Sequence, residues 1–143
     1  MAAQTQTAAP PKEAMPPINV WILPVIAAWI VPGGGHFMQK RTGRGALIFA
    51  SVALMFLFGL FMRGMMFTPD NSGDILTKLI TYGGFVCDLA NGALYFAATM
   101  FGYAAPDMPG AVHDYGTKFL VTAGLLNILA MVDSYEIAAG KKD

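Results

Sequence analysis

Four long apolar stretches, separated by polar segments, dominate the pattern of the chain. We expect helices over about 18–31, 45–62, 79–103 and 117–139. The stretch at 45–62 carries no charge and no proline, and about 20 apolar residues are enough to span the core of a bilayer. The first stretch is shorter and contains Pro24, which kinks a helix. The pattern predicts an all-α integral membrane bundle with three long spans and a shorter first segment that spans or re-enters.

Composition supports a membrane location. Hydrophobic residues make up 55% of the chain and charged residues 13%, against about 25% charged residues in ordinary soluble domains. The net charge is zero, which argues against a surface for nucleic acid. A chain of 143 residues is too short to hide this much apolar surface in a small globule. We expect a multi-pass protein of the cell inner (cytoplasmic) membrane, with the lipid bilayer as a partner.

The two ends of the chain differ from the membrane helical domain at 18–139. Residues 1–17 are polar and rich in proline and alanine, which predicts a flexible or extended tail. The segment does not have the pattern of a cleaved signal peptide, so we expect the tail to be retained. Residues 140–143 form a short basic C-terminal end.

Four crossings place successive loops on alternating sides of the membrane. Lys40 and His113 then share one side, whereas both termini and the loop at 63–74 share the other. Basic residues are divided almost evenly between the two sides, so the positive-inside rule leaves the orientation open.

The stretch VPGGGHFMQKRTGRG at 31–45 is rich in glycine and in basic residues. A dinucleotide-binding fingerprint needs Gly-x-Gly-x-x-Gly between a strand and a helix, but its third glycine falls on Met38. A turn between two membrane segments fits better, because Pro32 ends a helix and glycines permit a sharp reversal. The basic side chains then lie at the level of the lipid headgroups. The residues predicted for this interfacial turn are Gly33, Gly34, Gly35, His36, Lys40, Arg41 and Arg44.

The two histidines raise the question of a metal or haem site. His36 and His113 share a side in the four-span arrangement, and two neutral imidazoles can hold a haem iron or share a metal. Two ligands are too few for a closed zinc site, and we expect neither a metal nor a cofactor. Cys87 is the only cysteine and is expected to be a small packing residue. No spacing suggests a catalytic pair, so we do not expect an enzyme.

Small and polar residues recur at helical spacing within two of the predicted spans. Asp88 lies about 15 Å into its segment, near the middle of a bilayer. Such stripes are typical of helix contacts in lipid, and we expect Asp88 and Asn127 to bond across the bundle. The alternative is a proton or cation path, because an ionisable residue inside a span is a functional hypothesis by default. The predicted helix-packing residues are Gly84, Asp88, Asn91 and Tyr95 on one helix and Ala123, Asn127, Ala130 and Ser134 on the other.

Two segments carry a resemblance to known membrane proteins. The segment PGGGHFMQKRTGRGALIF resembles the junction of the TM-two domain family, in which a glycine-rich turn joins two apolar helices. The matching residues are Gly33, Gly35, His36, Phe37, Gly43 and Gly45, whereas Met38 stands where that family has tyrosine. The C-terminal segment resembles that of small uncharacterised bacterial membrane proteins through Leu125, Leu126, Asn127, Leu129, Asp133, Tyr135, Ile137, Ala138, Gly140 and Lys141. The resemblance implies a membrane protein of unknown biochemical role without enzyme activity.

Two functions remain open at this level. The first is a non-catalytic accessory or structural subunit of a larger membrane complex, held by helix faces to other membrane protein subunits or to itself. The second is a small oligomeric transporter or ion-conducting protein that uses Asp88.

Overall fold

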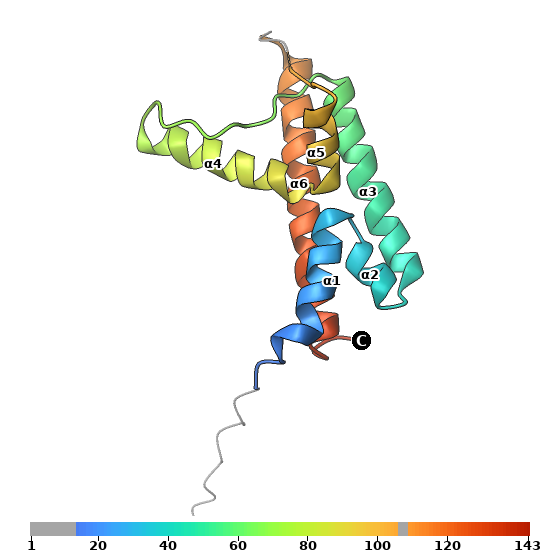
Figure 1. Ribbon diagram of the computed structural model, residues 1–143. Helices are drawn as coiled ribbons and strands as arrows, with labels where there is room; N and C mark the ends of the chain where they lie inside the picture. The colour runs from blue at the N-terminus through green and yellow to red at the C-terminus, as the bar shows by residue number, and fades with distance from the viewer. Residues whose placement is uncertain (1–13, 106–108) are drawn as a thin grey trace, which may run out of the picture.

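The structure is a computed structural model that describes residues 14–105 and 109–143, and in these residues it contains six helices and no strand (Figure 1). The prediction of an all-α protein is therefore confirmed. Most of the predicted tail at 1–17 lies outside the described residues, and residues 14–17 precede the first helix without regular structure. The helices are α1 (Ile18–Ile30), α2 (Gly34–Met38), α3 (Thr42–Phe61), α4 (Ile75–Ala90), α5 (Ala93–Met100) and α6 (Ala111–Ala138).

The longest helix, α6, is the axis on which the others pack. Its 28 residues correspond to a length of about 42 Å. Helix α3 runs antiparallel to α6, and the two approach closely where Gly59 and Gly64 face Gly116, because none of these residues has a side chain. The apolar core lies between them and α5, and it consists of Val52, Phe56, Ala98, Leu120 and Ala123.

Helices α1 and α2 form a hairpin along the C-terminal half of α6. The Trp21 ring contacts Tyr135 near the start of α1, and the end of α1 reaches the level of Asn127. The chain then reverses at Gly33, which has a φ of 78°, and α2 returns to the level of Ser134. The predicted glycine turn is therefore a reversal that contains a short helix of its own.

The predicted span at 79–103 is wrong as a single helix. It is divided into α4, which lies across the bundle, and α5, which runs toward the N-terminal end of α6 (Figure 1). The break falls at Gly92, where φ is 57° and a Cβ atom would lie 1.8 Å from the carbonyl oxygen of Trp29. Hydrophobicity alone does not reveal this break, because both flanking segments are apolar. The packing of α1 against Gly92 determines it.

Among the residues that the structure describes, two helices are long and apolar enough to cross a membrane, by length and composition. They are α3 and α6, and α1 is a shorter apolar helix. The helices begin earlier than predicted, since α3 starts at Thr42 and α6 at Ala111. The first turns of α6 contain polar residues typical of a loop, but they are held by contacts such as that between His113 Nδ1 and the Arg63 carbonyl oxygen, 2.7 Å apart.

The alternating-side arrangement of the loops is also wrong in this structure. His36 contacts Asp133 near the C-terminal end of α6, whereas His113 belongs to the first turn of that helix. Positions 113 and 133 are twenty residues apart, or about 30 Å along the helix. Lys40 and His113 therefore lie at opposite ends of the bundle. The reason is that α1 and α2, and likewise α4 and α5, form hairpins that each return to the end of the bundle from which they start.

Candidate functional site

The interior of the protein is unusually polar. The residues with fully buried polar side chains are His36, Asp88, Asn91, Asn127 and Ser134. The outer surface carries large apolar side chains on α1, α3, α4 and α6. Water-soluble domains mostly bury their apolar residues and expose their polar and charged ones. This protein differs, because many large apolar side chains are exposed and five polar side chains are fully buried. We therefore treat the buried polar side chains as the candidate site.

Asn127 joins the two hairpins in the middle of the molecule. Its Nδ2 donates hydrogen bonds to the carbonyl oxygens of Ala28, at 3.1 Å, and Ala90, at 2.8 Å. These carbonyl oxygens belong to the last turns of α1 and α4. The last four carbonyl oxygens of a helix receive no hydrogen bond from their own helix. One buried amide therefore satisfies the ends of two helices at once.

The C-terminal end of α4 is completely capped. The Asn91 side chain also donates to the Leu120 carbonyl oxygen on α6, so it connects the cap to the axis of the bundle. Each of the last four carbonyl oxygens of α4 has a donor: Asn91 Nδ2 for Cys87, Asn91 N–H for Asp88, Gly92 N–H and Trp29 Nε1 for Leu89, and Asn127 Nδ2 for Ala90. The arrangement stabilises a helix end inside the protein.

Asp88 does not bond to Asn127, contrary to the sequence-based hypothesis. Its Oδ2 accepts the backbone N–H of Phe67 at 2.7 Å, so it holds the loop that follows α3. Its Oδ1 has no hydrogen-bond partner among the described residues. The physical reason is that α4 lies across α6 (Figure 1), so the Asp88 carboxyl group contacts the loop between α3 and α4 and not Asn127.

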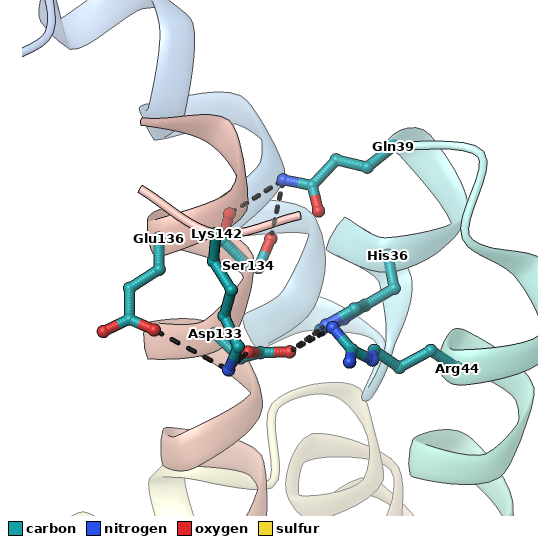
Figure 2. A network of polar contacts seen from close by, with 7 residues as sticks. All are labelled: His36, Gln39, Arg44, Asp133, Ser134, Glu136 and Lys142. Carbon is teal, nitrogen blue, oxygen red and sulfur yellow. Dashed lines mark hydrogen bonds and ion pairs between the residues drawn. The ribbon is translucent and has the colours of Figure 1, made fainter. Parts of the chain in front are cut away.

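A second polar cluster, which we call the clasp, ties α2 and the C-terminus to α6 (Figure 2). Asp133 is its centre. His36 Nε2 lies 2.9 Å from Asp133 Oδ2, Arg44 approaches the same oxygen at 3.5 Å, and Lys142 Nζ lies 2.5 Å from Asp133 Oδ1. His36 is fully buried, whereas the side chains of Arg44 and Lys142 are about half exposed. His36, which the sequence predicts in the interfacial turn, is therefore buried against α6 by this contact.

Gln39 and Ser134 complete the clasp. Gln39 Nε2 donates to the Ser134 carbonyl oxygen at 2.7 Å and to Ser134 Oγ at 3.4 Å (Figure 2). This contact requires Gly35, since a Cβ atom there would lie 2.1 Å from Ser134 Oγ. A glycine and a serine at the crossing let α2 approach α6 closely enough for the polar contacts to form.

We expect the clasp to depend mainly on the bond between Asp133 and His36. Replacing Asp133→Asn should lower the free energy of unfolding by about 1.5–3 kcal/mol, the range for a hydrogen bond to a charged group. The half-exposed partners Arg44 and Lys142 should contribute less. Thermal unfolding in detergent measures the loss. Glu136→Gln is the matched control, because Glu136 lies 3.8 Å from Lys142 at the surface. Equal stability losses for both variants would contradict the central role of Asp133.

Comparison with known proteins places the chain in a family. A model of one protein family matches residues 23–143, which is most of the chain. The chain belongs to this family, a family of unknown function (DUF6677). No curated protein matches the chain, and no solved structure does either. The matched region includes both polar clusters and begins within α1.

The structure places the predicted residues of this family member in two groups. The first group lies on α4 and the middle of α6 and consists of Gly84, Asp88, Asn91, Ala123 and Asn127. The second group lies at the clasp and consists of Gly35, His36 and Ser134. Ala130 is buried on α6 between the two groups. Tyr95 lies beyond the break at Gly92 and is only half-buried, so it does not continue the stripe of α4. Gly33 forms the reversal before α2, and Gly34 is the first residue of that helix. Lys40, Arg41 and Arg44 follow α2 on the outside, and Arg44 alone of these three contacts Asp133 in the described residues.

Three functional contacts were missed from the sequence. No local sequence pattern distinguishes Gln39 or Phe67, because each forms its hydrogen bond with a residue more than twenty positions away. Asp133 was part of the C-terminal resemblance but was not predicted as a site. His36 and His113 cannot share a ligand, because they lie at opposite ends of α6. Over residues 14–105 and 109–143, no three His, Cys, Asp or Glu side chains gather in a group that could hold a metal ion.

Proposed function

We propose that the protein is a non-catalytic structural subunit of the inner (cytoplasmic) membrane, in which α3 and α6 cross the bilayer and two hairpins re-enter it from opposite sides. Only 22% of the most apolar window of α3 and 33% of that of α6 is buried. The core helix of a soluble protein is mostly buried, so the exposure of these windows supports contact with lipid. The polar interior supports the same conclusion.

The hydrogen bonding of the hairpins supports re-entrant segments. Non-helical backbone is tolerated at membrane depth only where protein covers it and satisfies its polar groups. The reversal that ends α4 meets this condition, because Asn127, Asn91 and Trp29 supply its donors. Helix α1 ends at the same junction, where Asn127 reaches the Ala28 carbonyl oxygen.

Cysteine accessibility tests this topology. The Cys87→Ala background removes the single cysteine, and single cysteines are then introduced at Lys40, Asp70 and Val112. We expect the cysteine at Lys40 to react with a membrane-impermeant maleimide from one side, and those at Asp70 and Val112 to react from the other. Reaction of the Lys40 and Val112 variants from the same side would instead support four crossings and would overturn the re-entrant hairpins.

The proposed subunit role rests on the outward half of α4, which projects from the bundle (Figure 1). Its apolar side chains are highly exposed, at 87% for Ile75, 62% for Leu76, 69% for Leu79 and 57% for Ile80. The same half also carries Lys78, and a charged residue within a lipid-exposed helix is costly. A protein partner that covers this surface explains both features better than lipid alone.

Assembly size tests the role of α4. Leu76→Gln combined with Ile80→Gln should convert the assembly isolated in mild detergent to a smaller species, while the unfolding temperature of the chain stays unchanged. The reason is that both side chains face away from the rest of the described fold. Leu47→Gln combined with Leu54→Gln is the control, since these residues are equally exposed on α3. An assembly of wild-type size after the α4 substitutions would argue against this interface.

The spacing of the polar groups along α6 favours packing over ion conduction. The Leu120 carbonyl oxygen, Asn127 and Ser134 bind side chains or backbone of other helices, and they are seven residues, or about 10 Å, apart. Between them the helices touch directly, since a Cβ atom at Gly124 would lie 1.8 Å from the Cys87 carbonyl oxygen. Separate polar layers with close contacts between them are suited to setting helix register.

A further inference from the structure

The packing role does not explain how the buried carboxyl group of Asp88 is stabilised. Its side chain is fully buried, and only one of its oxygens has a hydrogen-bond partner in the described part of the chain. None of the ion pairs found there includes Asp88. Burying an ionised carboxylate without a partner is far more costly than burying a neutral acid. The group is therefore stable only if a positive charge from outside the chain joins it.

A pocket with a mixed polar and apolar lining lies beside the segment that binds Asp88. It has a volume of about 410 Å³, and Phe67 forms part of its wall. The Phe67 ring packs over Gly84 while its N–H donates to Asp88 Oδ2, so this residue both lines the pocket and contacts the carboxyl group. The remaining lining residues are Met65, His113, Asp114, Thr117, Lys118 and Val121.

The charged and titratable groups around this path come from three elements. The loop after α3 contributes Arg63, whose carbonyl oxygen contacts His113, and α6 contributes His113, Asp114 and Lys118. Helix α4 contributes Cys87, which is itself buried. His113, Asp114 and Lys118 line the pocket and Arg63 contacts His113, so these charged and titratable groups lie near the N-terminal end of α6.

The end of α4 that carries Asp88 packs closely against α6 and α1. Gly124 lies directly against the Cys87 carbonyl group, and Gly92 lies against the Trp29 carbonyl oxygen. The carbonyl oxygens at the end of α4 already have donors, so they are not free to coordinate a metal ion. A proton needs neither a cavity nor additional ligands, whereas a metal ion needs both.

We propose that Asp88 is a proton-binding site that exchanges with the aqueous phase through the pocket beside Phe67. The proposal goes beyond the packing role and does not depend on a partner protein. The site holds a proton on the carboxyl group of Asp88, and Phe67 controls its exchange. Exchange through this pocket makes Asp88 a site that responds to the proton concentration at the N-terminal end of α6.

Dicyclohexylcarbodiimide tests the proposal in the full-length protein. A protonated carboxyl group transfers its proton to a carbodiimide nitrogen, and its oxygen adds to the central carbon to give an O-acylurea, which rearranges to a stable N-acylurea. An exposed aspartate has a pKa of about 3.9 and is ionised at about pH 7. At this pH we expect peptide mass spectrometry to find the adduct on Asp88 and not on exposed Asp114, and we expect its rate to fall as the pH is raised.

Two variants and a test with Na⁺ separate the proton site and its route from the alternatives. Asp88→Asn should lose the adduct. Phe67→Ala retains the backbone N–H but removes the ring, so it should accelerate labelling severalfold, whereas the control Phe101→Ala, at an exposed position, should not. A folded wild-type protein that is not labelled at any pH would overturn the proton site, and an unchanged rate in Phe67→Ala would overturn the route. Protection by Na⁺ at constant ionic strength would assign the site to a metal ion instead.

Discussion

Asn127→Leu should lower the free energy of unfolding by about 2–4 kcal/mol, because it removes the donor from two carbonyl oxygens and an interhelical hydrogen bond in a membrane contributes about 1–2 kcal/mol. The two acceptors, on Ala28 and Ala90, are buried where α1 and α4 end. Leucine has a similar volume but donates no hydrogen bond, so neither helix end regains a partner. The loss should appear as a lower unfolding temperature in detergent, followed by circular dichroism.

A matched substitution on the same helix separates this effect from a general cost of mutation. The Thr122 hydroxyl is exposed and donates only to the Lys118 carbonyl oxygen of its own helix. Thr122→Ala should therefore change stability little. If Asn127→Leu were as stable as Thr122→Ala, the amide would not be the link between the hairpins, and the proposed re-entrant architecture would lose its main support.

Gly92→Ala should be at least as damaging, with a loss of about 2–5 kcal/mol. A side chain in the left-handed region costs about 1–2 kcal/mol, and overpacking costs about 1–3 kcal/mol more. Gly92 has a φ of 57°, and the new methyl group would meet the Trp29 carbonyl oxygen. Because that oxygen belongs to α1, the substitution should separate the two hairpins. Chemical unfolding in detergent measures the loss.

Gly83→Ala provides the opposite result on the same segment. Nothing lies within 4 Å of a Cβ atom at Gly83, and the residue lies within α4. Alanine is favoured over glycine inside a helix by about 0.5–1 kcal/mol, so this variant should be slightly more stable than the wild type. If both glycine variants behaved alike, the chain at 79–103 would be better described as one continuous helix.

The clasp illustrates how far motif recognition extends. His36 was found in the glycine-rich stretch and Asp133 in the C-terminal pattern, each from its own segment. Their contact joins positions 97 residues apart and buries the imidazole completely. Without that contact, a histidine between glycines and basic residues has the composition of an exposed turn. The error in predicting its environment follows from the missing partner and not from the local pattern.

The outcome for Asp88 has a similar cause. The sequence predicts Asp88 near the middle of a bilayer from its distance to Lys78, and in the structure the side chain is fully buried. It suggested Asn127 as the partner on the basis of equal depth in antiparallel helices. The orientation of α4 across the bundle instead presents Asp88 to the backbone of Phe67. Distance along the chain does not reveal the orientation of α4, which depends on the break at Gly92.

Local composition was sufficient for the helical class and for the approximate positions of α1, α3 and α6. Long runs without charge or turn residues favour helix and burial in lipid whatever their neighbours are. Contacts between distant segments were needed for the two reversals, since Gly33 and Gly92 adopt positive φ values where another segment presses against them. Helical periodicity reports the face of a single helix. The return of a hairpin depends on hydrogen-bond donors that another helix supplies, here chiefly Asn127.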